Sequence, residues 1–308
     1  MSKDPTDPEE SPAKQESGAP SSGTAHASSH DMPQGNGGMS NLAQRVITAV
    51  PALLILLALL AWAPQWLLAL LALVVTAQGL REYVGMQEEG DAQTPPALIY
   101  TVGLLPALGA LLGGAALATL GLSAGLAWML LWAWFQPERV TDPAPHVAKA
   151  ATALALIGWP LAHLGLLIAL PQGRGFFVLL LLVLVCNDTL AYFVGRIFGI
   201  TPLAPAISPN KTVEGSMAGL AGGALVGMLG AAWLPDDSPW GLFSMIGLGI
   251  VLAAAGQAGD LLESRLKRLH GVKDSSNLIP GHGGLLDRLD AFLLSAPLLY
   301  YLCLLVGN

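Results

Sequence analysis

Four polar residues near position 260 have the spacing of a single helix face. They are Asp260, Glu263, Ser264 and Lys267, at positions i, i+3, i+4 and i+7. Residues at this spacing lie on one side of an α-helix, so all four side chains can reach the same space. Carboxylates beside an ammonium and a hydroxyl are groups that bind a divalent cation or a phosphate.

A glycine-rich turn follows this face in the sequence. The run Pro280-Gly281-His282-Gly283-Gly284 contains glycines that tolerate positive φ and let backbone N–H groups approach a ligand closely. Asp287 and Asp290 then share a face at the start of the last apolar segment, where the helix dipole favours their charge. Magnesium takes one or two carboxylates and completes its octahedron with water and phosphate oxygens. Acidic pairs from two helices with a glycine turn between them therefore indicate a magnesium–polyphosphate site.

A second polar stretch lies between residues 188 and 215. Asp188, Tyr192 and Arg196 step along one side of an apolar segment that is expected to be helical. The run from Ser208 to Gly215, SPNKTVEG, offers hydroxyl and ammonium donors for a phosphate. The same residue types also make ordinary turns, so this stretch gains its weight from its partner near position 260.

The composition predicts an all-α, polytopic integral membrane protein. Of the 308 residues, 53% are hydrophobic and 11% are charged, whereas about 25% are charged in a soluble domain. Apolar stretches of about 18 or more residues predict membrane-spanning helices. A carboxylate inside such a stretch, as at Asp188, is costly, so it faces a polar cavity or an ion. The alternative is an internal salt bridge that fixes helix packing.

Nine spans are expected, in an N-in, C-out arrangement. A break around Ala118–Gly121 separates the third span from the fourth, and without it the count is eight. Thirteen of the 14 Lys and Arg residues fall on the side of the N terminus, which the positive-inside rule makes cytoplasmic. The spans lie near Val46–Trp62, Trp66–Tyr83, Ala97–Leu117, Leu120–Phe135, Ala150–Leu170, Gly175–Phe198, Val213–Leu234, Gly241–Leu262 and Asp287–Val306.

Three regions are expected along the chain. Residues 1–40 form a polar tail that cannot bury enough apolar surface to fold. Residues 41–173 hold five hydrophobic spans, in which His163 is the only ionisable residue well inside and is interpreted as a hydrogen-bonded interior histidine. Residues 174–308 hold the catalytic spans and their cytoplasmic loops. Cys186 and Cys303 lie in apolar runs and predict neither a disulfide nor a zinc site.

Two blocks of polar residues resemble a known enzyme family. The block from Ser264 to Asp290, with SRLKR, KD and IPGHGGLLDRLD, is similar to the signature of CDP-diacylglycerol synthases, also called phosphatidate cytidylyltransferases. The block from Asp188 to Gly215 is similar to a second shared block of that family. The resemblance covers roughly the last 120 residues. Many members have basic residues where this chain has Ile200-Thr201-Pro202, a departure that weakens this loop's expected part in binding triphosphate.

The resemblance implies an activity and a setting. The enzyme would transfer CMP from CTP to phosphatidic acid, giving CDP-diacylglycerol and pyrophosphate in phospholipid biosynthesis. It would use Mg²⁺, with or without a second cation, as a homodimer in the cell membrane. Its cavity would open to the cytoplasm and to lipid, with no nucleic-acid partner. A related enzyme for another lipid phosphate, such as an isoprenoid, is the alternative. A transporter is disfavoured because transporters have two similar halves and the polar residues here gather in one.

The same resemblance assigns roles to residues. The catalytic set is Asp188, Asp260, Lys267, Arg268, His282 and Asp287, of which Asp260 and Asp287 would hold the metal. The substrate-binding set is Arg196, Ser208, Lys211, Thr212, Glu214, Ser264, Lys273, Asp274, Gly283, Gly284, Arg288 and Asp290. A phosphate monoester has a second pKa of about 6, so the phosphate of the lipid, as nucleophile, is ionised without a dedicated base. Catalysis would then rest on positioning and charge neutralisation.

Overall fold

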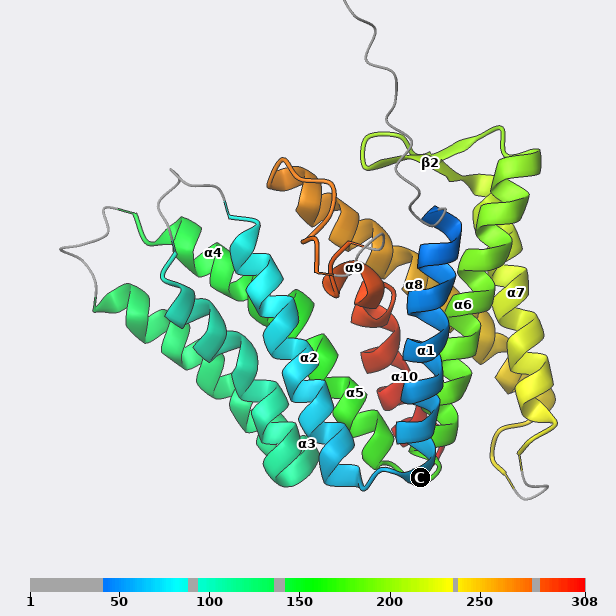
Figure 1. Ribbon diagram of the computed structural model, residues 1–308. Helices are drawn as coiled ribbons and strands as arrows, with labels where there is room; N and C mark the ends of the chain where they lie inside the picture. Colours follow the sequence, from blue (N-terminus) through cyan, green and yellow to red (C-terminus); the bar gives the residue numbers. More distant parts are fainter. Residues whose placement is uncertain (1–40, 88–93, 136–141, 235–237, 279–282, 308) are drawn as a thin grey trace, which may run out of the picture. The chain divides into compact units, whose positions relative to one another are not determined.

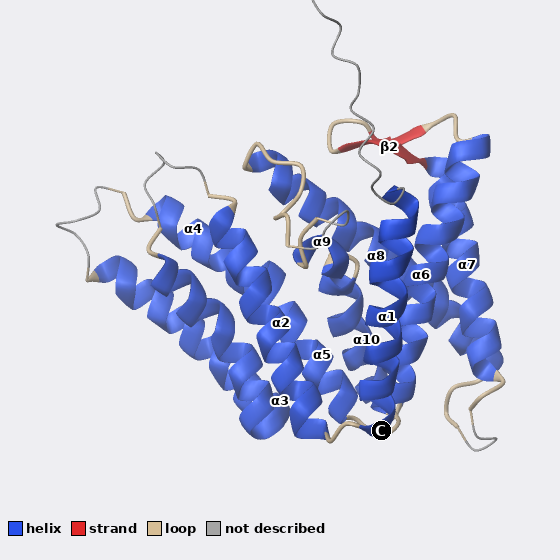
Figure 2. Ribbon diagram, in the orientation of Figure 1, coloured by secondary structure: helices blue, strands red, loops and turns tan. Residues whose placement is uncertain are grey.

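The computed structural model describes residues 41–87, 94–135, 142–234, 238–278 and 283–307, and of residues 41–50 and 52 the backbone alone. These described residues are almost entirely helical, as the sequence predicts (Figures 1 and 2). The helices are α1 (Asn41–Trp62), α2 (Gln65–Gly85), α3 (Pro96–Trp134), α4 (Ala144–Thr152), the π-helical η1 (Ala153–Gly158), α5 (Trp159–Ala169), α6 (Gly173–Phe198), α7 (Val213–Ala231), α8 (Leu242–Leu269), α9 (Leu286–Leu289) and α10 (Phe292–Val306). The predicted tail, residues 1–40, lies outside the described residues.

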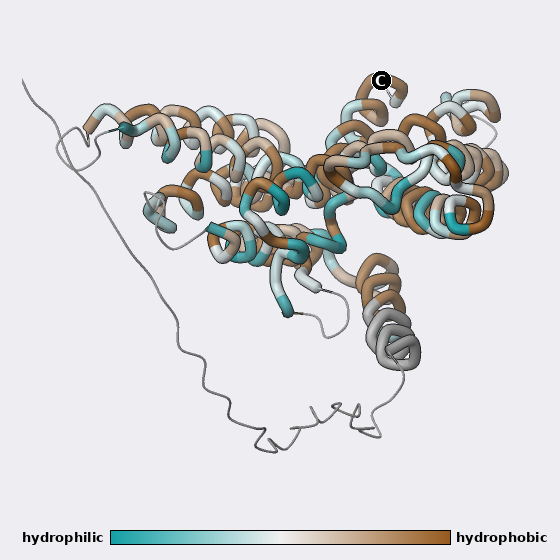
Figure 3. The backbone as a smooth tube through the Cα atoms, turned by 90° about the horizontal axis from the view of Figure 1, so that it is seen from above, coloured by the Kyte–Doolittle hydropathy of each residue, from teal (hydrophilic) through white to brown (hydrophobic). Residues whose placement is uncertain are grey.

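Within the described part of the chain, six helical segments are long and apolar enough to cross a membrane. Apolar residues recur along the length of these helices, as the hydropathy colouring of Figure 3 shows. The shorter apolar helices are Leu53–Trp62 and Phe292–Val306. The six segments are Gln65–Gly85, Pro96–Trp134, Ala144–Ala169, Gly173–Phe198, Val213–Ala231 and Leu242–Leu269.

Helix α3 is folded back on itself at two glycines. Gly113 and Gly114 have non-helical dihedral angles, and Gly114 has φ 65°. The predicted break at Ala118–Gly121 is therefore wrong by several residues, because Gly114 supplies the positive φ that the turn needs. The two arms touch: a Cβ at Gly109 or Gly121 would lie 2.1 or 2.3 Å from a backbone oxygen of the other arm (Figure 1).

Helices α6, α7 and α8 pack against one another through small residues. A Cβ at Gly223 of α7 would lie 2.4 Å from the carbonyl oxygen of Gly249 in α8. A Cβ at Gly219 would lie 2.4 Å from the Asn187 amide oxygen and 2.8 Å from the Gln257 amide nitrogen. Small residues let helix backbones approach closely in a membrane. This contact brings polar residues of all three helices together at one level.

The segment between α6 and α7 is a small hairpin rather than a plain loop. Strands β1 (Pro202–Ala204) and β2 (Ser208–Thr212) pair in antiparallel fashion, with Pro202 opposite Thr212 and Ala204 opposite Ser208. β2 runs directly into α7, so the hairpin fixes the position of Lys211 at the start of that helix. The sequence gives no alternating pattern here, because strands this short carry no periodicity.

His163 is interior, as predicted. Its ring is fully buried, and Nδ1 lies 2.8 Å from the Trp159 carbonyl oxygen one helical turn away. Cys186 and Cys303 are free thiols, so the two cysteines form no disulfide with each other.

Candidate active site

A polar cavity of about 570 Å³ lies between α6, the β2–α7 junction and α8. Five residues of the predicted site line it: Asp188, Arg196, Lys211, Thr212 and Asp260. The sequence separates them by up to 72 positions, so only the packing of the helices brings them together. We call this space the polar cavity; its further lining residues include Asn187, Tyr192, Asn210, Ser216 and Gln257.

An ion pair stands on the cavity wall. The Lys211 ammonium donates to the Asp260 carboxylate, and each side chain is 29% exposed. The Ser264 hydroxyl donates to the other carboxylate oxygen at 3.3 Å. A partly exposed pair of this kind contributes little to stability and exchanges partners readily. Lys211 can therefore turn from Asp260 to a phosphate, and Asp260 can accept a cation in its place.

Asp188 reaches the same cavity from α6. Asn187 donates to its carboxylate at 2.9 Å and accepts from Gln257 of α8 at 2.7 Å, and Gln257 accepts from Ser216 of α7 at 2.5 Å. This chain of hydrogen bonds joins the three helices behind the carboxylate. Because its neighbours are held, the Asp188 side chain has a fixed position at the cavity wall.

The predicted side of α6 is confirmed. Asp188, Tyr192 and Arg196 all line the polar cavity, and the Arg196 guanidinium donates to the Tyr192 hydroxyl at 2.7 Å. Residues 188, 192 and 196 follow one another at intervals of four, so one helix face carries all three. Arg196 is exposed and stands in the last turn of α6.

A second group of charged residues is closed to solvent. The Lys267 ammonium lies 2.5 Å from Glu263 and 2.5 Å from the Oδ1 atom of Asp287. The Oδ2 atom of Asp287 accepts from the backbone N–H and the hydroxyl of Ser275, both at 2.9 Å, and from the Gly284 N–H at 2.7 Å. These donors replace the hydration that the buried carboxylate has lost.

Glu82 completes this group from the other half of the chain. Its carboxylate accepts from the hydroxyls of Ser275 at 2.9 Å and Ser276 at 3.0 Å. It also accepts from the backbone N–H groups of Leu285 at 2.9 Å and Leu286 at 2.7 Å. Glu82 is 3% exposed, so these bonds replace its hydration. We call Glu82, Glu263, Lys267, Ser275 and Asp287 the closed cluster.

Sequence reasoning missed Glu82. It stands at the end of an apolar segment, where a charge is ordinarily solvated, and 193 positions separate it from Ser275. The one available signal is that Arg81 and Glu82 are the charged residues of an otherwise apolar segment. The first half of the chain therefore contributes a carboxylate to the segment between α8 and α9, and is not merely hydrophobic. We call the described residues of that segment, 270–278 and 283–285, the signature loop.

The glycine turn is shaped by this packing. Gly283 has φ 80°, and a Cβ at Gly284 would lie 2.0 Å from the Ser275 hydroxyl and 2.5 Å from Glu82. The backbone N–H of Gly284 points to Asp287 rather than to open space. These two glycines hence make room for the closed cluster. The preceding residues of the turn, including the predicted His282, lie outside the described residues.

Asp290 links the closed cluster to the polar cavity. It follows Asp287 by one helical turn, and its carbonyl oxygen would lie 2.4 Å from a Cβ at Gly259, the neighbour of Asp260. The residues just before α10 therefore lie beside the C-terminal half of α8.

The two acids predicted to hold a metal differ in their capacity to do so. A carboxylate has about four acceptor positions. Asp287 accepts from the Lys267 ammonium and from the Ser275 and Gly284 N–H groups, and the one hydroxyl hydrogen of Ser275 is shared between Asp287 and Glu82. Asp260 has two donors and stands at the open cavity. Among the described residues no group of three or more His, Cys, Asp or Glu has the geometry of a metal site. Asp260 therefore has more acceptor capacity left than Asp287, and it faces the open cavity.

Two predicted substrate-binding residues cap local structure. The Glu214 carboxylate accepts from the backbone N–H groups of Ile200 at 3.1 Å and Thr201 at 3.2 Å, which closes the base of the hairpin. The Thr212 hydroxyl accepts from the Gly215 N–H at 3.2 Å and caps α7. Thr212 still lines the polar cavity, but Glu214 is not among its lining residues.

The remaining predicted residues lie around the two groups. Arg268 is exposed and donates to the Val272 carbonyl oxygen at 2.9 Å. Lys273, Asp274 and Arg288 are exposed, and Ser208 is half-buried in β2. The charge of Arg288 acts on Asp188, so this arginine is near the polar cavity.

The chain is similar to a known protein family and to several of its members. Residues 43–306 match the model of the cytidylyltransferase family. A phosphatidate cytidylyltransferase of Mycobacterium bovis is 31% identical over 278 residues, covering 83% of this chain and 86% of that relative. Those of Synechocystis sp. and Bacillus subtilis are 48% and 47% identical over 121 and 118 residues, covering 39% and 38% of this chain and 40% and 42% of the relatives.

Proposed function

The chain belongs to the cytidylyltransferase family, and on this premise we propose that it transfers CMP from CTP to phosphatidate, giving CDP-diacylglycerol and pyrophosphate for phospholipid biosynthesis. The observation that carries the proposal is the polar cavity at one end of apolar helices, where Lys211 and Asp260 form a partly exposed pair. Such a cavity can take a polyanion on one side while a lipid remains in the hydrocarbon. An enzyme that joins a nucleotide to a lipid requires this arrangement.

In the proposed reaction the phosphate of phosphatidate attacks the α-phosphorus of CTP. A new phosphorus–oxygen bond forms, the bond from the α-phosphorus to the bridging oxygen breaks, and pyrophosphate leaves with that oxygen. The attacking phosphate is mostly dianionic at neutral pH, because its second pKa is about 6. Two polyanions must meet, so Lys211 and Arg196 contribute by neutralising charge and by fixing the phosphates in line.

Magnesium is the cation of this proposal. When bound, it neutralises triphosphate charge and polarises the α-phosphorus. Asp260 would hold it from the cavity wall, since this carboxylate already faces the cavity and is paired only with Lys211 and Ser264. Asp287 would join as a second ligand if Lys267 released one of its oxygens. Otherwise Asp287 acts through Lys267 and the signature loop.

The proposed setting is the cell membrane, with the chain as a homodimer that crosses nine times from an N terminus inside to a C terminus outside. The two arms of α3 supply the third and fourth spans. The excess of Lys and Arg on one side supports the orientation. Single cysteines at Asn210 and Asp274, in a variant without Cys186 and Cys303, should react only with a cytoplasmic reagent. Labelling of the two from opposite faces would contradict the proposal.

The activity test uses the purified full chain in detergent with labelled CTP, phosphatidate and Mg²⁺. Labelled CDP-diacylglycerol should appear in the lipid phase and pyrophosphate in the aqueous phase. Product formed equally in excess EDTA would overturn the cation requirement. Equal product from ATP or GTP would overturn the nucleotide, and preference for an isoprenoid phosphate over phosphatidate would overturn the lipid.

A further inference from the structure

The hairpin of β1 and β2 forms one wall of the polar cavity. Leu203 of β1 and Asn210, Lys211 and Thr212 of β2 line this cavity. Apart from pairing with each other, the two strands mainly contact the ends of α6 and α7. Figure 2 shows the hairpin at the end of the bundle where α6 ends and α7 begins. The ion pair of Lys211 with Asp260 joins this wall to α8.

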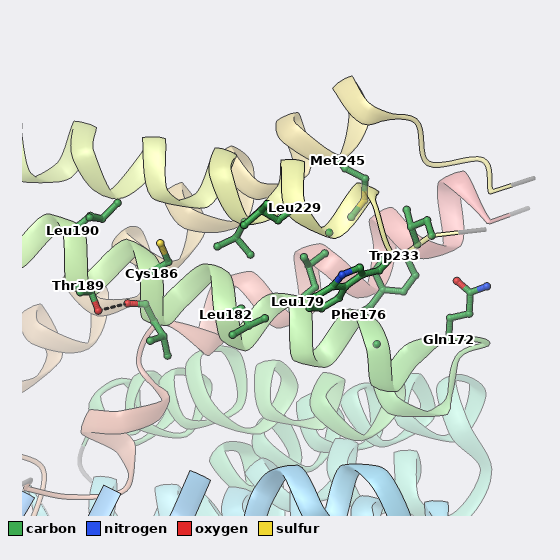
Figure 4. Close-up of a pocket in the computed structure, with 15 residues that line it drawn as sticks. Gln172, Phe176, Leu179, Leu182, Cys186, Thr189, Leu190, Leu229, Trp233 and Met245 are labelled. Carbon is green, nitrogen blue, oxygen red and sulfur yellow. Dashed lines mark hydrogen bonds between the residues drawn. The ribbon is translucent and has the colours of Figure 1, made fainter. Parts of the chain in front are cut away.

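A second cavity shows by contrast which space can take phosphates. It has a volume of about 680 Å³ and lies along α6 and α7, where Phe176, Leu179 and Leu229 are among its lining residues (Figure 4). Of the described residues that line it, none is charged. Phosphates are bound most strongly by ionised donors. The polar cavity, with Lys211 on the hairpin and Arg196 on α6, is therefore the space that fits a triphosphate.

The base of the hairpin is held from the first turn of α7. The Oε2 atom of Glu214 accepts from the backbone N–H groups of Ile200 at 3.1 Å and Thr201 at 3.2 Å, and its Oε1 atom accepts from Thr201 at 3.2 Å. The Val213 N–H donates to the Thr201 carbonyl oxygen at 2.9 Å. Ile200 and Thr201 connect α6 to β1. Both polar groups of the Thr201 backbone are therefore bound by the residues that begin α7.

Thr212 fixes the other strand at the same level. A Cβ at Gly195 of α6 would lie 2.9 Å from its hydroxyl oxygen, and one at Gly199 would lie 2.7 Å from its methyl carbon. On the side of α7, a Cβ at Gly215 would lie 3.0 Å from the same hydroxyl oxygen. The side chain that follows Lys211 is therefore enclosed between the ends of α6 and α7, and both strands are held where they meet the helices.

These contacts become important when Lys211 changes its partner. In the proposed function the Lys211 ammonium leaves Asp260 for a phosphate of CTP, and the hairpin then loses this link to α8. A lysine has a flexible four-carbon stem, so where its ammonium can reach depends on where its backbone is held. A backbone that is held beforehand lowers the entropy that binding costs. The bonds of Glu214 involve neither Lys211 nor Asp260, so they persist through the exchange.

We propose that Glu214 is a positioning residue, which holds the base of the hairpin so that Lys211 stays at the polar cavity while it exchanges Asp260 for a phosphate of CTP. This inference rests on the proposed function, and it replaces the direct substrate contact that the sequence predicts for Glu214. Glu214 is not among the lining residues of the cavity, and a carboxylate in contact with the triphosphate would repel it. The hairpin requires the reach of this side chain to two N–H groups, and its charge is secondary.

The test separates the reach of the side chain from its charge, in the purified full chain with labelled CTP and Mg²⁺. Glu214→Asp keeps the carboxylate but is one methylene shorter, so it loses the bonds to Ile200 and Thr201. Glu214→Gln keeps the length, and its amide oxygen can accept from both N–H groups, as Oε2 already does. We expect Glu214→Asp to weaken CTP binding in equilibrium dialysis about three- to tenfold, the range for one hydrogen bond.

The two substitutions should also differ in kinetics and in amide exchange. In Glu214→Asp, KM for CTP should rise while turnover at saturating CTP stays within about twofold, because bound phosphate then holds Lys211 in place. Glu214→Gln should keep CTP affinity and turnover within about twofold, because its bonds to the hairpin remain. Amide exchange at residues 200 and 201 should become faster in Glu214→Asp only.

Two comparisons show whether the effect passes through Lys211. In a Lys211→Met background, Glu214→Asp should change CTP binding by less than about twofold, because residues that act as one unit are non-additive. Asp142→Ala is the matched control and should leave CTP binding unchanged. Asp142 is also an exposed carboxylate that accepts from a backbone N–H at the start of a helix, and it does not line the polar cavity.

The outcomes separate this inference from the proposed function. A wild-type protein that binds CTP but makes no CDP-diacylglycerol contradicts the function, whereas the binding comparisons still decide the inference. A wild type that does not bind CTP overturns both. Weaker binding in Glu214→Gln than in Glu214→Asp, equal effects of the two, or an undiminished effect of Glu214→Asp without Lys211 overturns the inference alone. If Glu214→Asp does not fold, Glu214→Ala takes its place in the same comparison.

Discussion

The polar cavity and the closed cluster each contain a lysine–aspartate pair, but in opposite surroundings. Lys211 and Asp260 are each 29% exposed and have few other partners. Lys267 and Asp287 are 10% and 6% exposed, and every oxygen of Asp287 is hydrogen-bonded. Helix α8 supplies one member of each pair, Asp260 and Lys267. The difference between them is therefore in access to solvent and not in residue type.

This difference in solvent exposure indicates different roles for the two pairs. A partly exposed pair loses little when it separates, so it can open to take a phosphate and a cation. A buried pair costs about 3–5 kcal/mol when one partner is removed, so it keeps its geometry. We therefore expect the polar cavity to bind the reacting groups. The closed cluster should hold the helix ends and the signature loop around them.

The largest effect should follow from Asp260→Asn. The substitution keeps the shape and removes the charge that faces the cavity, so turnover should fall about 10³-fold, as on loss of one electrostatic group in other sites. The melting temperature in detergent should stay near that of the wild type, because the side chain is partly exposed. Asp142→Asn is the matched control, since Asp142 is exposed, lines neither group and accepts from the Ala144 N–H at the start of α4.

Retention of more than a tenth of wild-type turnover by Asp260→Asn at saturating Mg²⁺ would show that this aspartate is not a primary ligand. It would also remove the distinction between the two pairs, because the open pair would then be dispensable.

Asp287→Asn should reduce both turnover and stability. An amide in this position turns an N–H group toward Ser275, Gly284 or Lys267, all of which are donors. The loss of the buried charge should destabilise the fold by about 3 kcal/mol, and turnover should also fall by about 10³-fold if the carboxylate is a ligand. If the two aspartates act as one unit, the double variant should be scarcely worse than either single one. Losses that multiply would instead separate the cavity from the cluster.

Some of this architecture could be predicted from the sequence and some could not. The face of α6 follows from helical periodicity, which correctly grouped Asp188 with Arg196. On α8 the same periodicity placed Asp260 and Lys267 in one space, but Asp260 lines the polar cavity whereas Lys267 pairs with Glu263 and Asp287 in the closed cluster. The donors gathered around Asp287 could not be predicted, because they depend on how a loop folds back. The contact of Glu82 with that loop depends on the packing of helices far apart in sequence, which leaves no periodic signal.

The break in α3 was likewise predicted only in part from the sequence. The sequence predicts two spans between residues 97 and 135, and two antiparallel arms are present. Small residues at several positions made the location of the break ambiguous. Only Gly114 takes the positive φ, and Gly121 instead lets the second arm pack closely on the first.

Glu82→Gln should have an intermediate effect. Both oxygens of Glu82 accept from backbone N–H groups, at Leu285 and Leu286, so the amide nitrogen of glutamine must face a donor. We expect about a tenfold loss of kcat/KM, by displacement of the signature loop, in the range of about 1–3 kcal/mol for an unsatisfied buried group. Amide exchange at residues 283–286 should become faster. The control is Thr76→Val in the same helix, because the Thr76 hydroxyl bonds only within α2.

An unchanged exchange rate at residues 283–286 in Glu82→Gln would show that the loop does not depend on this carboxylate. The closed cluster would then end at Asp287, and the first half of the chain would have no part in positioning the site.

Asp290→Asn should have the smallest effect, on turnover. The Asp290 carboxylate accepts from the backbone N–H of Ala291 at 2.7 Å, and the amide oxygen of asparagine can accept the same hydrogen bond. The backbone carbonyl oxygen of Asp290, which lies beside Gly259, is unchanged by the substitution. We therefore expect turnover with labelled CTP to fall by less than about tenfold, within the range for one hydrogen bond, and the melting temperature in detergent to stay near that of the wild type. A loss as large as that of Asp260→Asn would show that the Asp290 carboxylate belongs with the reacting groups of the polar cavity.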